Sequence, residues 1–315
     1  MTKTQIALVG IGAGAAAALM FASVASGSLL SIFLFYVAPL PIMIAALGWS
    51  HWAAMIAALG AATTLASVFG GMFFLAFMIG TGIPAWWLGY LAMLARPGAN
   101  EGSLEWYPPG RLVLWCAVLA TIVISIGVLT FGTDLDTFRT EMRRGLERMI
   151  YSPPGMSGDA NRAQLFDFLV TVLPAAAAVV ATTTNAINLW LAARIVKFSG
   201  RLQRPWPHLP AMTFPGKAAA VLAVAVGLTF IGGIGGLLAM VASAALVIAY
   251  GILGFAVLHA VTRHGRGRGL VLGIAYASVI VFFWPIFALC LLGLADTAID
   301  LRGRAARRGG PPAVT

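Results

Sequence analysis

The chain has 315 residues, of which 60% are hydrophobic and 10% charged, and its formal net charge is +10. Soluble domains carry about 25% charged residues, so this composition excludes a soluble globular fold. The two cysteines, Cys116 and Cys290, both lie in apolar segments. They can form neither a disulfide framework nor a four-thiolate metal site.

The apolar residues form runs that are long enough to cross a bilayer, for which roughly 18 residues suffice. Backbone groups in hydrocarbon must be satisfied within their own segment, and the ten-residue alternation of a membrane barrel is missing, so the spans should be helices. The sequence therefore predicts an all-α fold, a polytopic transmembrane helical bundle of about eight or nine spans that forms a single transmembrane domain over 1–315. The candidate spans are 6–25, 29–47, 52–69, 72–95, 112–131, 166–196, 218–231, 237–261 and 270–295.

Small residues share one face of the first span, at Gly10, Gly14 and Ala18. A face without bulky side chains lets a second helix approach closely. We predict a helix-docking role for these residues, and the docking partner is either another helix of this chain or a separate membrane subunit. The glycines here are no dinucleotide fingerprint, because the first acidic residue of the chain is Glu101.

Charged loops orient the bundle, since cytoplasmic loops are enriched in Lys and Arg. The basic loops 194–217 and 263–268 are expected in the cytoplasm, together with the N-terminus and the loop 96–111, whereas the loop after Phe131 is expected outside. A single last span would send the Arg-rich tail outside. Two alternatives keep the tail in the cytoplasm. In the first, Pro285 interrupts that segment, so a broken or re-entrant helix would return the tail. Equally, in the second, one of the early predicted spans does not cross the membrane. We expect a multi-pass protein of the bacterial cytoplasmic (inner) membrane.

The one sizeable extramembrane segment lies near 132–162, where apolar residues recur at spacings of three and four. This pattern predicts an amphipathic helix, capped by Thr133 or Asp134 and lying on the membrane surface. A partner-binding or gating helix is the alternative. The tail 303–315 is expected to be disordered.

A polar cluster interrupts the sixth span near its middle, with Thr182, Asn185 and Asn188. Polar groups in hydrocarbon are costly and usually face a bundle interior or a cavity. These three residues are the candidate ligand-binding site. The alternative is that they form hydrogen bonds between neighbouring helices.

The sequence shows no pattern that is typical of a metal site or of catalytic residues. The four histidines are scattered without a second ligand at helical spacing, no nucleophile elbow occurs, and no carboxylate pair lies in a span. We therefore predict no enzyme activity, no catalytic residues, no metal and no cofactor. The basic residues lie in short loops beside apolar spans, so the expected partner is the lipid bilayer and not nucleic acid.

Three short motifs in the second half suggest a family. They are Asn188-Leu189-Trp190-Leu191-Ala192-Ala193-Arg194, Arg204-Pro205-Trp206-Pro207-His208-Leu209-Pro210, and Gly293-Leu294-Ala295-Asp296 ahead of Arg302. The arrangement resembles the YybS-like family of uncharacterised bacterial integral membrane proteins. That family is distantly similar to the S components of energy-coupling factor transporters, which bind vitamins or metal ions and dock on a partner through small-residue helix faces.

The resemblance implies a docking role for Gly10, Gly14 and Ala18 and a ligand role for Asn185 and Asn188. It also implies a partner, either another membrane subunit or an ATPase module. This chain has more spans than the six of a typical S component. The resulting hypothesis is a small-molecule-binding subunit of a transporter. The alternative is a structural or regulatory membrane protein that recruits partners and binds no substrate.

Overall fold

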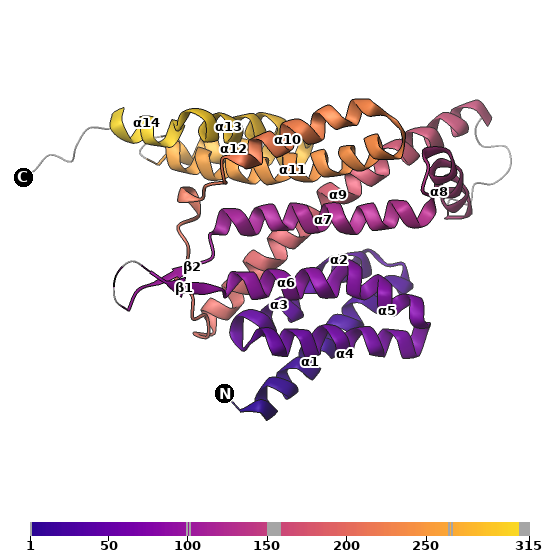
Figure 1. Ribbon diagram of the computed structural model, residues 1–315, viewed down its shortest axis with the longest axis horizontal. Coiled ribbons are helices and arrows are strands. Elements are labelled where there is room, and N and C mark those ends of the chain that lie inside the picture. The colour runs from indigo at the N-terminus through magenta and orange to yellow at the C-terminus, as the bar shows by residue number, and fades with distance from the viewer. Residues whose placement is uncertain are drawn as a thin grey trace, which may run out of the picture. The chain divides into compact units, whose positions relative to one another are not determined.

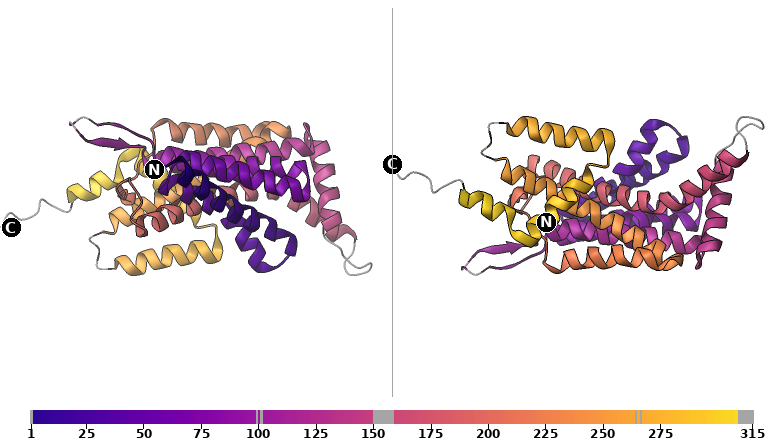
Figure 2. Two further views of the ribbon diagram at one scale, coloured as in Figure 1. Left: turned by 90° about the horizontal axis from the view of Figure 1, so that it is seen from below. Right: turned by 90° about the horizontal axis from the view of Figure 1, so that it is seen from above.

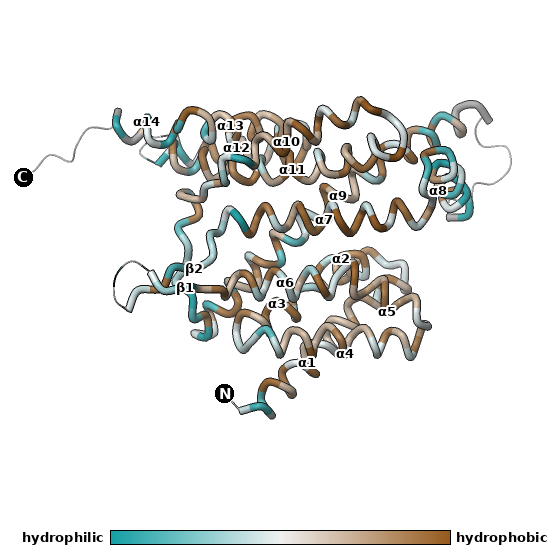
Figure 3. The backbone as a smooth tube through the Cα atoms, viewed as in Figure 1, coloured by the Kyte–Doolittle hydropathy of each residue, from teal (hydrophilic) through white to brown (hydrophobic). Residues whose placement is uncertain are grey.

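The structure is a computed structural model, and it describes residues 2–98, 100, 102–149, 159–263, 265 and 267–308. The chain is an all-α polytopic bundle (Figure 1). Seven of its described helices are long and apolar enough to cross a membrane. Hydrophilic residues concentrate on α8, α14 and the connections between the apolar helices (Figure 3).

The elements of the first half are α1 (Lys3–Ala22), α2 (Leu29–Val37), α3 (Pro39–Gly48), α4 (His51–Phe69), α5 (Gly71–Phe77), a π-helical segment (Met78–Gly82), α6 (Ile83–Ala92), β1 (Ala95–Pro97), β2 (Leu104–Trp106), α7 (Pro109–Phe131) and α8 (Leu135–Met149). Those of the second half are α9 (Asp159–Phe198), α10 (Lys217–Leu228), α11 (Gly233–Val261), α12 (Arg268–Phe282), α13 (Ile286–Ile299) and α14 (Leu301–Arg308). Short 3-10 turns cover Ser23–Ser26, Leu209–Ala211 and Thr229–Ile231.

The spans predicted from the sequence agree with these helices, with one exception. The predicted ends lie within four residues of the observed ones for every span except 270–295. The short segment Lys217–Ile231 added to the seven long spans gives eight. The sequence did not predict the ribbon of β1 and β2, in which Ala95 pairs with Trp106 and Pro97 with Leu104.

The chain forms two compact units, each assembled from segments that are far apart in the sequence. Unit 1 comprises 1–116 and 183–208, and unit 2 comprises 117–182 and 209–315. The division falls inside α7 and α9, so neither unit is a continuous stretch of chain.

In unit 1, α1 packs against α4 through small residues. A Cβ added at Gly10 would lie 2.8 Å from the carbonyl oxygen of Ala53, and one added at Gly14 would lie 2.7 Å from that of Ala57. Ala18, on the same face of α1, is only 4% exposed. The two backbones therefore touch with no space for a larger side chain between them.

In unit 2, α11 is the central helix and packs closely on α13. A Cβ added at Gly251 would lie 2.6 Å from Cδ1 of Ile286, and one added at Gly293 would lie 2.6 Å from the carbonyl oxygen of Tyr250. At Gly254 an added Cβ would overlap the carbonyl group of Leu289. Three glycines on two facing helices thus set this interhelical distance.

The predicted last span is a pair of short helices. Phe283 has φ of 60° and Pro285 follows it, so the chain turns back between α12 and α13. With 15 and 14 residues, these helices are only about 22 and 21 Å long, less than the roughly 30 Å of a bilayer core. In both views of Figure 2, α12 lies at the edge of unit 2, and none of its residues is buried. The expectation of a broken last helix is confirmed, and its re-entry into the membrane stays a prediction.

The amphipathic segment forms α8, and Asp134 is its cap. The Asp134 carboxylate accepts the backbone N–H of Thr137 at 2.8 Å. Hydrogen bonding with the side chain and then the backbone of Thr137 lowers the pKa of Asp134. Phe138 is 1% exposed and packs with Val128, Val170 and Leu237. Residues 150–158 of the predicted segment lie outside the described residues.

The start of the tail is helical where the sequence predicted disorder from residue 303. Leu301–Arg308 form α14, which Arg302 anchors through hydrogen bonds to Asp296. The composition of the tail predicts disorder, because composition does not show that Arg302 bonds to residues elsewhere in the chain. Residues 309–315 of the predicted tail lie outside the described residues.

Replacing Gly254 with Ala tests the contact between α11 and α13. The added methyl group must push backbone against backbone, and overpacking of this kind typically costs about 1–3 kcal/mol. We expect a lower midpoint of thermal unfolding in detergent for Gly254→Ala. Gly227→Ala in α10 is the matched control, because nothing lies within 4 Å of its added Cβ. Equal midpoints for the two variants would contradict the close contact.

Candidate functional site

The predicted ligand-binding residues lie on α9 and are all buried. Thr182 is 0%, Asn185 7% and Asn188 3% exposed. The hydroxyl of Thr182 donates to the carbonyl oxygen of Ala178 one turn earlier, at 2.7 Å. The hydroxyl hydrogen of Thr182 is thus already bonded inside its own helix.

Asn188 stabilises a broken helix within unit 1. Its Nδ2 donates to the carbonyl oxygens of Tyr36 and Thr184, both at 2.9 Å. Tyr36 is the penultimate residue of α2, and its carbonyl accepts no backbone N–H from the described residues across the break between α2 and α3. Pro39 and Pro41 disturb the same turn, because they cannot donate to the carbonyls four residues before them. The side-chain amide supplies a donor at the place where the backbone ladder is interrupted.

Asn185 differs from its neighbours, because its side chain makes no hydrogen bond to any described residue. The Oδ1 of Asn188, one turn away, likewise accepts no hydrogen bond from the described part of the chain. Two amide groups on one face of α9 therefore retain unused hydrogen-bonding capacity.

A second irregular segment contacts the broken helix in unit 1. The π-helical turn Met78–Gly82 packs against α3 and α4, and Thr81 within it is 6% exposed. The ring of Phe21 contacts those of Phe35 and Phe77 at centroid distances of 5.0 and 5.1 Å. Breaks and π-turns in membrane helices occur frequently at functional positions.

Two indole groups add further unused donors in unit 1. The Nε1 atoms of Trp86 and Trp87 are buried and have no hydrogen-bond partner among the described residues. Trp86 stacks on Tyr90 at 6.1 Å, and Trp87 meets Trp115 edge to face at 5.4 Å. The sequence analysis missed these donors, since tryptophans near span ends are typical of membrane interfaces.

The predicted docking residues Gly10, Gly14 and Ala18 are covered by α4 of the same chain. Of the two partners left open by the sequence, the described contact is with another helix of this chain. A separate subunit could use this face only by displacing α4, so the docking of such a subunit stays a prediction.

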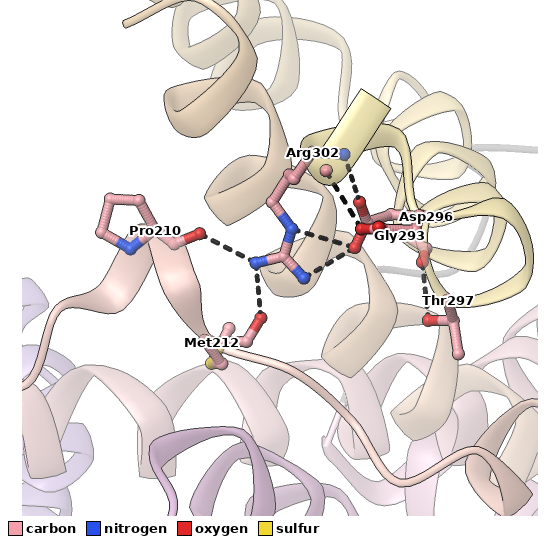
Figure 4. Close-up of polar contacts among 8 residues, drawn as sticks. Pro210, Met212, Gly293, Asp296, Thr297 and Arg302 are labelled. Atoms are coloured by element: carbon pink, nitrogen blue, oxygen red, sulfur yellow. Dashed lines mark hydrogen bonds and ion pairs between the residues drawn. The ribbon is translucent and has the colours of Figure 1, made fainter. Parts of the chain in front are cut away.

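A buried ionic cluster joins the loop before α10 to the end of α13 and the start of α14 (Figure 4). The Arg302 guanidinium donates to Oδ2 of Asp296 from Nε at 3.0 Å and from Nη2 at 2.6 Å. Its Nη1 donates to the carbonyl oxygens of Pro210 and Met212, both at 2.8 Å. The side chains are 4% exposed for Asp296 and 15% for Arg302. The tail is thereby held against the loop that precedes α10.

Arg204 makes a comparable connection in unit 1. It donates to the carbonyl oxygens of Ala92 at 3.0 Å and Tyr107 at 2.8 Å, and burial lowers the pKa of Arg204. Ala92 is the last residue of α6, where helix carbonyls need external donors. The sequence offered one signal for the Arg302 cluster, a lone acid in an apolar run with Arg six residues later, and none for Arg204.

Among the described residues there is no group of three or more His, Cys, Asp or Glu side chains that could hold a metal ion. Burial of the cysteines, both of which lie in apolar helices, leaves no exposed thiol. Around Asn185 and Asn188, the described part of unit 1 offers hydrogen bonding by amides, indoles and carbonyls.

The fold and these contacts define a polytopic helical membrane protein with polar groups buried inside its bundle. The chain matches the family of predicted membrane proteins DUF2232 over residues 15–297, and it belongs to that family. No curated protein and no solved structure matches the chain.

Replacing Arg302 tests the ionic cluster. Arg302→Gln leaves the buried Asp296 carboxylate without its cation, and breaking a buried ion pair costs about 3–5 kcal/mol. We expect a lower unfolding midpoint and faster proteolysis of the loop around Pro210. Arg304→Gln, which changes an exposed arginine on the same helix, is the control. The cluster would be unimportant for stability if the two variants behaved alike.

Proposed function

We propose that the protein is a solute-binding membrane subunit of a transporter, and that Asn185 is the main contact to the solute. The observation that carries this proposal is the side chain of Asn185, a residue that is only 7% exposed and whose amide has no hydrogen bond to any described residue. Buried polar groups are nearly always paired, and each exception needs an explanation. A bound solute supplies the missing partner.

The chemistry of the face indicates the class of solute. Asn185 offers a donor and an acceptor, and Asn188 retains its Oδ1 as an acceptor. Residues three apart on a helix lie about 5–6 Å from each other at Cβ, so both amides can reach one molecule. Thr182 lies on the same helix, but its hydroxyl hydrogen is already donated to Ala178. Amide groups without charge favour an uncharged polar solute.

The broken backbone beside Asn188 supports the same proposal. Discontinuous helices in transporters commonly adjoin the substrate site, where unwound backbone groups line a cavity. The break between α2 and α3 has its carbonyl at Tyr36 bonded by Asn188. A solute that contacts Oδ1 of Asn188 would thus lie beside the break between α2 and α3.

The transport energy has to come from a partner, because the sequence contains no phosphate-binding loop. We propose an ATPase module or a second membrane subunit in that role, in the bacterial inner membrane. Since α4 covers the small-residue face of α1, such a partner would dock on another lipid-facing surface.

One set of contacts favours the alternative of a structural or regulatory membrane protein without a substrate. Thr182 and the Nδ2 of Asn188 are fully used inside the chain. The Arg302 cluster likewise orders the expected cytoplasmic face without any ligand.

The decisive experiment is native mass spectrometry of gently purified protein, comparing wild type, Asn185→Ala and Ser243→Ala. Ser243 is a matched control, because it is 8% exposed and its hydroxyl bonds to Ala239 within α11. We expect a bound polar solute in wild type and Ser243→Ala, and its loss in Asn185→Ala at an unchanged unfolding midpoint.

Asn188→Ala should lose the solute and also unfold at lower temperature, since the Tyr36 carbonyl loses its donor. Solute retention unchanged in Asn185→Ala would contradict the site. A wild-type chain that carries neither solute nor partner would favour the structural or regulatory role.

A further inference from the structure

A charged cleft lies between α8 and α9 in unit 2, and we refer to it as the α8–α9 cleft. Its volume is ≈ 410 Å³, within the range of about 300–1,000 Å³ that is typical of small-molecule sites. Its lining residues are Arg139, Thr140 and Arg143 from α8 and Asp167, Val170 and Thr171 from α9. None of these side chains belongs to the polar cluster around Asn185.

The two arginines of the cleft are in different electrostatic situations. Arg143 donates to the Asp167 carboxylate at 3.1 Å and to that of Glu147 at 3.2 Å. Arg139 forms no ion pair with any described residue. The lining residues carry two positive charges and one negative charge, and Glu147 adds a second negative charge next to Arg143. Arg139 is therefore the lining arginine whose charge is available to a ligand.

The cleft is held in place from its base. Phe138 precedes Arg139 and is 1% exposed, and it packs against Val128, Val170 and Leu237 from three other helices. Val170 also lines the cleft. Because Phe138 fixes α8 on the bundle, the arginines do not have to be ordered by a ligand, which lowers the entropic cost of binding.

Hydroxyl groups complete the set of donors. Thr171 donates to the backbone carbonyl of Asp167 at 2.9 Å. The hydroxyl of Thr140 makes no hydrogen bond to any described residue and can donate to an anion. Two guanidinium groups and one free hydroxyl suit a group with three acceptor oxygens.

We propose that the α8–α9 cleft binds a phosphate group, held by Arg139 and Arg143 with Thr140 as a further donor. The phosphate belongs either to a small soluble phosphate compound or to the headgroup of an anionic phospholipid. The amphipathic α8 carries four arginines and three acidic residues. Amphipathic helices with arginines on the polar face lie at a membrane surface, where both are within reach. The proposal does not depend on a solute at Asn185.

The test has two arms, both with the purified full-length protein. The first measures binding of inorganic phosphate in detergent by calorimetry, and the second measures phosphatidylglycerol retained from mixed phosphatidylcholine nanodiscs by native mass spectrometry. The variants are Arg139→Gln, Asp167→Asn and the control Arg144→Gln. Arg144 is an exposed arginine of α8 that pairs with Glu141 and does not line the cleft.

We expect Arg139→Gln to weaken binding about tenfold or more, the effect of one lost charge-assisted hydrogen bond. Asp167→Asn should strengthen binding, because it frees Arg143 from its carboxylate, whereas a purely structural ion pair would give weaker binding. Phosphate binding identifies a soluble ligand, and phosphatidylglycerol retention alone identifies a lipid headgroup. Equal binding by Arg139→Gln and Arg144→Gln in both arms, or no binding by wild type in either arm, would overturn the proposal.

Discussion

Every backbone carbonyl that lies in hydrocarbon needs a donor, and this requirement explains the positions of Asn188 and Arg204. An unsatisfied group in the bilayer costs several kcal/mol, so an interrupted helix must be completed by another part of the protein. Asn188 does this for Tyr36 at the break between α2 and α3. Arg204 does it for Ala92 at the end of α6.

The same requirement organises the expected cytoplasmic end of unit 2. Arg302 bonds two carbonyls of the loop around Pro210, and Asp296 balances its charge in a site that is largely removed from water. A buried arginine with one carboxylate and two carbonyls is fully paired, so the ionic cluster can persist there. The loop, α13 and α14 are thereby connected. Asn185 stands out against this background because it is only 7% exposed and its amide has no hydrogen bond to any described residue.

The sequence predicted most of the fold, because the lengths and positions of apolar runs follow directly from the thickness of a bilayer. It also placed the small-residue face of α1 and the amphipathic helix, for whose cap it offered Thr133 or Asp134; the structure uses Asp134. It could not decide how the segment around Pro285 folds, since a proline permits both a kink and a reversal. The positive φ of Phe283, which completes the turn, has no sequence signal.

The site was predicted in part. Polar residues in a span pointed to Thr182, Asn185 and Asn188, but hydropathy cannot tell which of them is already bonded. That distinction depends on Tyr36, 152 residues away from Asn188 in the chain. The Arg302 contacts with Pro210 and Met212 also join positions about ninety residues apart, and no local pattern encodes such pairs.

A re-entrant hairpin of α12 and α13 would place the tail on the cytoplasmic side of the membrane, and cysteine accessibility tests it most directly. Arg148→Cys on α8 and Arg307→Cys on α14 would each be treated with a membrane-impermeant maleimide, in intact and in permeabilised cells. Wild type gives the background, because Cys116 and Cys290 are buried. We predict labelling of Arg148→Cys in intact cells and of Arg307→Cys only after permeabilisation. Labelling of Arg307→Cys in intact cells would mean that the last segment crosses the membrane once, and would contradict the re-entrant hairpin.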